Sequence, residues 1–129
     1  MRITLASIFV EDQDRALAFY TNALGFEKKH DIPLGPYRWL TVTSAEGVAG
    51  VELLLEPLAF PPARDYQKAL FGAGIPATAF MSGNIHDEFQ RLKARGVSFR
   101  GEPMKMGPVI TVLFEDTCGN LINLVQPTD

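Results

Sequence analysis

Short apolar stretches alternate along this chain with longer stretches in which apolar residues recur at helical spacing. Ile3–Val10 is rich in β-branched and aromatic residues and is typical of a strand. Asp12 can cap a helix, and from Ala16 to Leu24 apolar side chains recur at steps of three and four, which predicts a helix after it. Gly25 follows where a left-handed residue commonly ends a helix.

Three further strands are predicted after this helix. A turn rich in proline and glycine separates a strand at about Phe26–Asp31 from a strand at about Tyr37–Thr43. After a loop over residues 44–50, Val51–Glu56 forms the last strand of this half. The order of elements is therefore β-α-β-β-β.

The second half of the chain repeats the plan of the first. Three pairs of positions mark the repeat: Asp12 with Asn84, Leu40 with Ile110, and Glu52 with Asn123. Their offsets are 72, 70 and 71 residues, which is nearly constant over three separate elements. Two copies of one supersecondary unit explain this spacing.

The second copy predicts the same elements, with a helical linker before it. The expected elements are a strand near Ile75–Met81, a helix near Ile85–Arg95, and strands near Ser98–Arg100, Val109–Phe114 and Leu121–Gln126. Between the copies, Arg64–Phe71 reads as helical after a double proline. We expect one α+β domain of two tandem βαβββ modules, with module one at 1–57, a linker helix at 58–73 and module two at 74–129.

Side-chain alternation assigns one face of each sheet to the core and the other to a cleft. Val51, Leu53 and Leu55 form an apolar set that suits a helix-covered face, so Glu52 and Leu54 should point to the opposite, concave face. An indole, hydroxyls, a carboxylate and an amide on one face are more typical of a ligand cleft than of a core. The candidate ligand-binding residues are Phe9, Trp39, Thr41, Glu52, Leu54, Phe80, Met106, Thr111 and Asn123.

Each candidate also has a purely structural interpretation. Glu52 suits a solvated strand position, Trp39 suits a core, and the threonines are good strand formers. Outside this set, His30 has no neighbouring carboxylate in the sequence except Asp31, and His86 should be exposed. The single cysteine, Cys118, has no adjoining His or Lys to activate its thiol.

Composition narrows the function class. The chain has 129 residues, 47% hydrophobic and 21% charged, which is typical of one globular domain. A net charge of −3 offers no basic field for nucleic acid, and the apolar runs are too short to cross a membrane. One cysteine and no recognisable signal peptide favour a cytoplasmic location.

Two motifs resemble a known family. Val10-Glu11-Asp12, followed by Arg15–Tyr20 and Leu24-Gly25-Phe26, is similar to the opening signature of the vicinal oxygen chelate family. Asp116–Asn120 followed by Leu121–Gln126 is similar to its closing hairpin and final strand, with Cys118 where an Asp is common. This family includes glyoxalase I, bleomycin-resistance proteins and extradiol dioxygenases. The resemblance implies paired βαβββ modules around a U-shaped cleft, usually assembled as a homodimer.

The resemblance also implies four positions at which the family's enzymes bind a divalent metal. In this chain these positions are Leu5, Glu52, Ala77 and Asn123. One carboxylate and one amide beside two aliphatic side chains do not make a tight site for Zn²⁺, Ni²⁺ or Fe²⁺. We therefore expect no metal and no other cofactor.

Three functions remain open at this stage. The first is a metal-free protein, like the family's drug-sequestering members, that binds a small, partly aromatic or apolar molecule. The second is a metal-independent enzyme in which burial raises the pKa of Glu52 so that it acts as a general base, helped by Asn123, Thr41 or Arg38. The third, least favoured by the missing ligands, is metal-dependent glyoxalase or dioxygenase activity.

Overall fold

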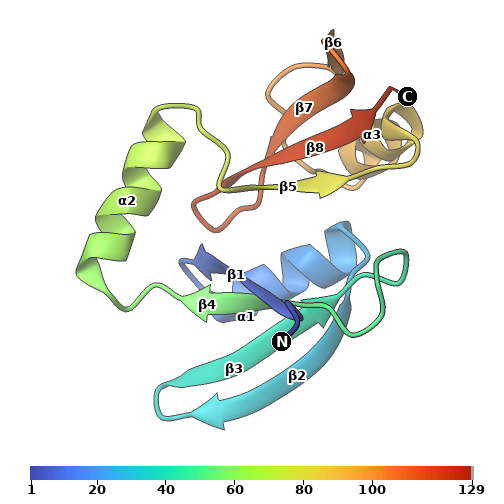
Figure 1. The fold of residues 1–129 in the computed structure, drawn as a ribbon. Coiled ribbons are helices and arrows are strands. Elements are labelled where there is room, and N and C mark those ends of the chain that lie inside the picture. Colours follow the sequence, from blue (N-terminus) through green and yellow to red (C-terminus); the bar gives the residue numbers. More distant parts are fainter. Residues whose placement is uncertain (129) are drawn as a thin grey trace. The chain divides into compact units, whose positions relative to one another are not determined.

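A computed structural model describes residues 1–128 as two compact units, Met1–Tyr66 and the remainder from Gln67. The first unit contains β1 (Leu5–Val10), α1 (Gln13–Ala18), a π-helical turn (Phe19–Ala23), β2 (Glu27–Leu34), β3 (Tyr37–Thr43) and β4 (Glu52–Pro57). Its sheet has the order β1-β4-β3-β2 (Figure 1). β1 is parallel to β4, and the other pairs are antiparallel.

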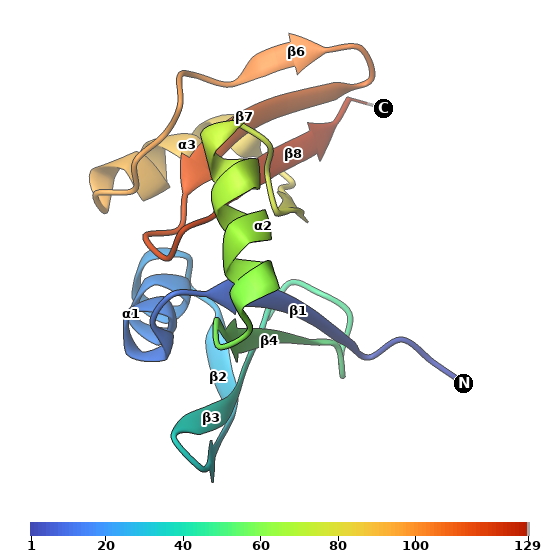
Figure 2. The same cartoon turned by 90° about the vertical axis from the view of Figure 1, so that its left-hand side faces the viewer.

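The second unit has the same plan. It contains β5 (Thr78–Met81), α3 (Ile85–Ala94), β6 (Met104–Met106), β7 (Val109–Glu115) and β8 (Leu121–Pro127). Its sheet order, β5-β8-β7-β6, corresponds strand for strand to that of the first, with β6 at the outer edge beside β7 (Figure 2). The α+β fold of two tandem modules is therefore confirmed.

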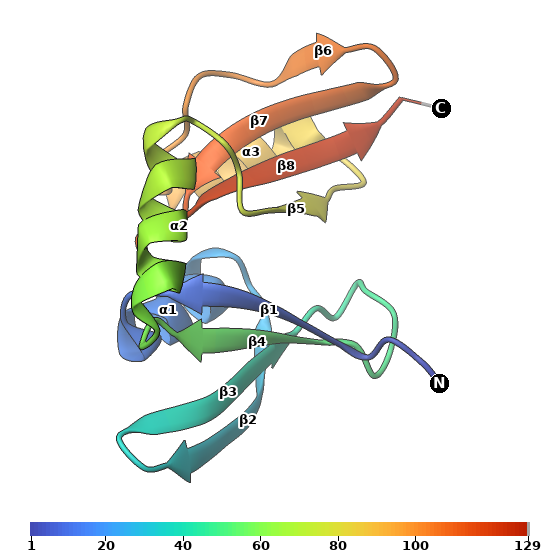
Figure 3. The same cartoon turned by 60° about the vertical axis from the view of Figure 1, so that its left-hand side comes forward.

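Caps and buried helix faces explain why each helix forms where it does. The Asp12 carboxylate accepts the backbone N–H of Arg15 at 2.9 Å, and the Asn84 side chain accepts that of Asp87 at 3.2 Å. In the first unit, the buried face of the helix lies over the buried face of the sheet, which carries Ile8, Val10, Leu40, Val42 and Leu55. In the second unit, α3 lies over one face of β7 and β8 (Figure 3) and buries Ile85, Phe89 and Leu92. Each sheet thus has one helix-covered core face.

Two local predictions were inexact. The helix after Asp12 becomes a π-helix at Phe19, where the Thr21 hydroxyl donates to the Leu17 carbonyl at 2.6 Å. The linker helix α2 spans Pro61–Gly72, which is longer than the helical stretch expected at Arg64–Phe71 and lies within the predicted linker at 58–73. None of the helices among residues 1–128 is long and apolar enough to span a membrane.

The prediction of a strand at Ser98–Arg100 was wrong. Only Phe99 forms a bridge there, to Phe114, and its ring packs against Phe89 and Phe114 in the core. The edge strand is Met104–Met106 instead, because Gly107, at φ 61°, allows a tight hairpin into β7.

Candidate functional site

The face of the first sheet that is opposite to the buried helix-facing residues carries most of the candidate residues of the first module. The register pairs Ile32 with Trp39, His30 with Thr41, Thr41 with Leu54, and Leu5 with Glu52. Phe9 pairs with Glu56 on the same side. Paired and alternate residues of a sheet share a face, so these side chains form one surface. Part of it is apolar and exposed, with Leu5 at 41% and Ile32 at 49%.

Three polar side chains meet within this surface, and we call them the Thr41–Glu52–His30 cluster. The Thr41 hydroxyl donates to Glu52 Oε1 at 2.6 Å, and His30 Nδ1 lies 2.8 Å from the same oxygen. The backbone N–H of His30 donates to the Thr41 hydroxyl oxygen at 3.1 Å. Thr41 is fully buried, so its hydroxyl is fixed between the two strands and Glu52.

The position of His30 differs from the sequence-based interpretation, which gave it no carboxylate partner beyond Asp31. A β-bulge between Lys28 and His30 shifts the register of β2 by one residue. Lys28 pairs with Val42 on the core-facing side, but His30 pairs with Thr41 on the other. The bulge therefore turns the imidazole toward Glu52, which lies 22 residues further along the chain.

The raised pKa expected for Glu52 was also wrong. The hydrogen bond from Thr41, and then that from His30, holds the pKa of Glu52 below its usual range, although burial acts in the opposite direction. A carboxylate stabilised in its charged form is a weaker base. Glu52 is therefore suited to holding His30 and not to removing a proton from a substrate.

The lowered pKa of Glu52 predicts an acid-dependent contribution to stability. A carboxyl whose pKa is lower in the folded state stabilises the protein above its unfolded pKa, and this stabilisation is lost as pH falls through the folded pKa. We expect Glu52→Gln to lower the free energy of unfolding by about 1 kcal/mol at pH 7. The difference from wild type should shrink as pH falls below about 4.5, the ordinary pKa of a glutamate side chain, measured by urea unfolding.

The matched control is Glu46→Gln, because Glu46 lies in an exposed loop between β3 and β4. Its difference from wild type should stay near zero at every pH. A difference for Glu52→Gln that stays the same from pH 7 to pH 3 would contradict the role given to the cluster.

The second sheet carries a reduced version of the cluster. The Thr111 hydroxyl donates to Asn123 Oδ1, as Thr41 donates to Glu52. Met104 pairs with Thr111 where His30 pairs with Thr41, and Met106 pairs with Val109 where Ile32 pairs with Trp39. The second module therefore places two exposed methionines where the first has His30 and Ile32.

Phe80 does not belong to this surface of the second sheet. It pairs with Leu124, and the register places it with the buried residues Ile122 and Leu124 on the α3-facing side. Asn123 pairs with Ala79 and points the other way. The expectation that Phe80 faces the ligand cleft was wrong, because the register of β5 places it on the face opposite to Asn123.

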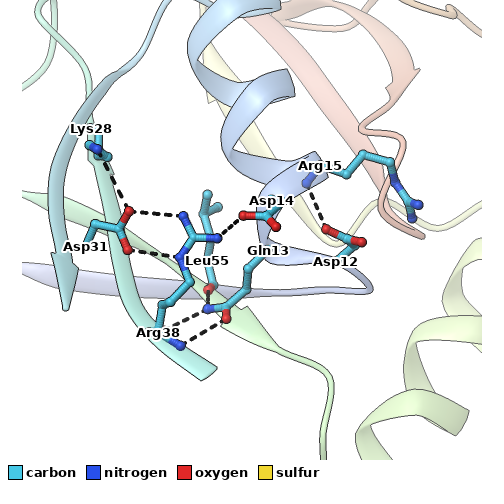
Figure 4. A network of polar contacts seen from close by, with 8 residues as sticks. All are labelled: Asp12, Gln13, Asp14, Arg15, Lys28, Asp31, Arg38 and Leu55. Atoms are coloured by element: carbon cyan, nitrogen blue, oxygen red, sulfur yellow. Dashed lines mark hydrogen bonds and ion pairs between the residues drawn. The ribbon is translucent and has the colours of Figure 1, made fainter. Parts of the chain in front are cut away.

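Arg38 lies on the other face of the first sheet, which removes the role considered for it beside Glu52. Its guanidinium donates to both carboxylate oxygens of Asp31, at 2.9 and 3.0 Å, and to Asp14 at the start of α1 (Figure 4). The Arg38 guanidinium holds the pKa of Asp31 below its usual range, and Asp31 in turn raises the pKa of Arg38. The Arg38 guanidinium is already paired with two carboxylates, so it does not polarise a substrate carbonyl beside Glu52.

Gln13 completes this network where β3 and β4 diverge. Its amide donates to the carbonyls of Arg38 and Leu55, at 2.7 and 3.0 Å, and its oxygen accepts the Arg38 N–H at 3.1 Å (Figure 4). A depression of about 350 Å³ opens here, lined by residues that include Gln13, Tyr37, Arg38 and Arg64. The network fixes the base of the hairpin that carries His30, Ile32 and Trp39.

Comparisons with known proteins agree with the fold and the motifs. The sequence model of the Glyoxalase/Bleomycin resistance protein/Dioxygenase superfamily matches residues 2–124. The chain belongs to this superfamily. It is 54% identical to the protein YurT of Bacillus subtilis (strain 168) over 126 residues, which covers 98% of this chain and 99% of YurT.

Two solved structures of the superfamily are similar along the whole chain. The crystal structure of UcmS2 is 31% identical, with a TM-score of 0.82 and 97% of each chain covered. The structure of TnmS3, an antibiotic binding protein from Streptomyces sp. CB03234, is 28% identical, with a TM-score of 0.76, covering 98% of this chain and 96% of TnmS3.

The residues at the superfamily's metal-binding positions do not fit a metal ion. In the first module, Leu5 pairs directly with Glu52 and supplies no donor atom, while Glu52 is engaged by Thr41 and His30. In the second, Ala77 and Asn123 offer a single amide. Across residues 1–128, no three His, Cys, Asp or Glu side chains gather in a way that could hold an ion.

Proposed function

We propose that this member of the superfamily binds a small, partly aromatic or apolar molecule without a metal ion. The observation that carries the proposal is the surface of the first sheet, where Trp39, Ile32 and Leu54 share one face with the Thr41–Glu52–His30 cluster. An apolar surface with a few fixed polar groups is typical of ligand sites.

The relatives support the same function. TnmS3, which covers nearly the whole chain, is an antibiotic binding protein. The donor atoms that a metal-dependent glyoxalase or dioxygenase would need are missing from the corresponding positions, which favours binding over that chemistry. We further propose that Phe9 contributes to this ligand site, and that Met106, Thr111 and Asn123 form a ligand-binding surface on the second sheet. We also propose that the protein acts in the cytoplasm as a homodimer.

The sole tryptophan provides the test. Trp39 is only partly buried, so a bound aromatic compound should quench or shift its fluorescence. We expect at least one compound from a panel of planar and polycyclic aromatic molecules to do so with a saturable titration, confirmed by calorimetry on metal-free protein. A panel without a saturable response by either method would overturn the proposal.

The homodimer has a separate test. Sedimentation equilibrium at micromolar protein should give about twice the mass of one chain, and the mass of a single chain would refute this part alone.

A further inference from the structure

The imidazole ring of His30 is held through one of its two nitrogens. Nδ1 lies 2.8 Å from Glu52 Oε1, and the same oxygen accepts the Thr41 hydroxyl. An ionised carboxylate is an acceptor only, so the proton of this hydrogen bond belongs to Nδ1. In a neutral imidazole the other nitrogen, Nε2, is then an acceptor with a fixed direction.

Nε2 is available to a ligand. The His30 side chain is 42% exposed, and within residues 1–128 the hydrogen bonds of His30 outside the strand ladder are those of its backbone N–H and of Nδ1. Ile32 lies two residues further on the same face, and Trp39 is the cross-strand partner of Ile32. A single hydrogen-bond acceptor therefore adjoins an apolar and aromatic stretch of sheet.

The charged and apolar groups around His30 Nε2 determine which ligand group can bind there. The Glu52 carboxylate repels an anion, and a ligand carbonyl would meet an acceptor instead of a donor. An ammonium group is strongly hydrated and matches the apolar stretch poorly. A neutral hydroxyl on an aromatic or conjugated frame can donate to Nε2 while its rings cover Ile32 and Trp39.

We propose that His30 accepts a hydrogen bond from a phenolic or enolic hydroxyl of the ligand. In this arrangement His30 determines specificity, while Glu52 and Thr41 are positioning residues that keep the proton on Nδ1. The inference rests on the proposed binding function and names the class of ligand for it. In the second module, Met104 occupies the position equivalent to His30. The imidazole acceptor therefore belongs to the first module.

A matched pair of probes tests the inference. We expect 2-naphthol to bind wild-type protein about five-fold more tightly than its methyl ether, because the ether has no hydrogen to donate. His30→Phe keeps a planar ring but lacks Nε2, so its two dissociation constants should become equal. His86→Phe replaces the other histidine, which is exposed on α3, and should keep the wild-type preference.

The tautomer can be measured without any ligand. Nitrogen-15 NMR distinguishes protonated from unprotonated ring nitrogens, and near pH 8 we expect His30 to carry its proton on Nδ1. Glu52→Leu removes the acceptor and should shift a measurable fraction of the proton to Nε2, with a smaller preference for 2-naphthol. His86 should show the same tautomer ratio in both proteins.

The outcomes separate the two proposals. Equal binding of 2-naphthol and its ether by wild type, or a proton found on Nε2, would overturn the role of His30 and leave the binding function intact. Failure of both probes, together with a negative aromatic panel, would overturn the binding function and this inference with it. A preference for 2-naphthol that survives His30→Phe would place the hydroxyl elsewhere and refute the inference alone.

Discussion

Replacing Asp116 with alanine is expected to lower the free energy of unfolding by about 3 kcal/mol. The Asp116 side chain is fully buried in the turn between β7 and β8. Its Oδ1 accepts the backbone N–H groups of Cys118 and Asn120, at 2.8 and 3.0 Å, and Oδ2 accepts the Asn120 side-chain amide at 2.8 Å. Alanine would leave these three donors without their acceptor in a buried turn, and each such loss costs about 1 kcal/mol or more.

Urea unfolding followed by circular dichroism would measure this loss. The control is Asp65→Ala, an exposed aspartate on α2, which should change the free energy of unfolding by less than about 0.5 kcal/mol. Asp116→Asn keeps one oxygen for the backbone donors but turns an amide toward the Asn120 amide, so it should fall between the two. A loss for Asp116→Ala as small as that for Asp65→Ala would refute the structural role of this turn.

The same turn shows how much of the fold can be predicted from a sequence motif. The Asp-Thr-Cys-Gly-Asn pattern predicted the hairpin before the last strand, and Gly119 sits there at φ 94°. A Cβ atom added at Gly119 would lie 2.7 Å from Gln67 Oε1. The Gln67 side-chain amide donates to the Cys118 carbonyl at 3.1 Å. Residue type and spacing therefore predicted the turn, but not the glutamine that packs against it, because Gln67 is about fifty residues away in the sequence.

The repeat was predictable for a similar reason. Apolar periodicity and a nearly constant offset of about 71 residues were enough to predict two βαβββ modules, which the identical strand orders confirm. The edge strand Met104–Met106 was missed, because a three-residue strand with a lysine between two methionines has too little periodicity to be distinguished from a loop.

The candidate site was predicted in outline, but its chemistry was not. Alternation along β3 and β4 placed Thr41 and Glu52 on one face, as the register does. His30 was missed because simple alternation cannot locate a bulge, and one extra residue moves a side chain to the other face. The pKa of Glu52 depends on the two donors that this bulge helps to bring together, so its direction could not be deduced from burial alone.

If the proposed binding function is right, Trp39→Ala should weaken the affinity for an aromatic ligand by about thirty-fold. Trp39 lies on the same face as Thr41 and Ile32 and is the largest aromatic side chain on it. Truncating a tryptophan that packs on a ligand commonly costs about 2 kcal/mol, and 1.4 kcal/mol corresponds to a factor of ten in affinity. Trp39→Phe keeps a ring for stacking and should lose only about three-fold.

Because both variants lack the only tryptophan, calorimetry should measure the dissociation constants, with the compound that gave the best titration on wild type. Phe60→Ala is the matched control, since Phe60 is 65% exposed and follows β4 outside the sheet. Its affinity should stay within about two-fold of wild type. Thermal unfolding should show that Trp39→Ala remains folded, because the core residues Leu40 and Val42 lie on the opposite side of β3. An affinity of folded Trp39→Ala equal to that of Phe60→Ala would mean that the ligand does not rest on Trp39, and would move the site away from this face.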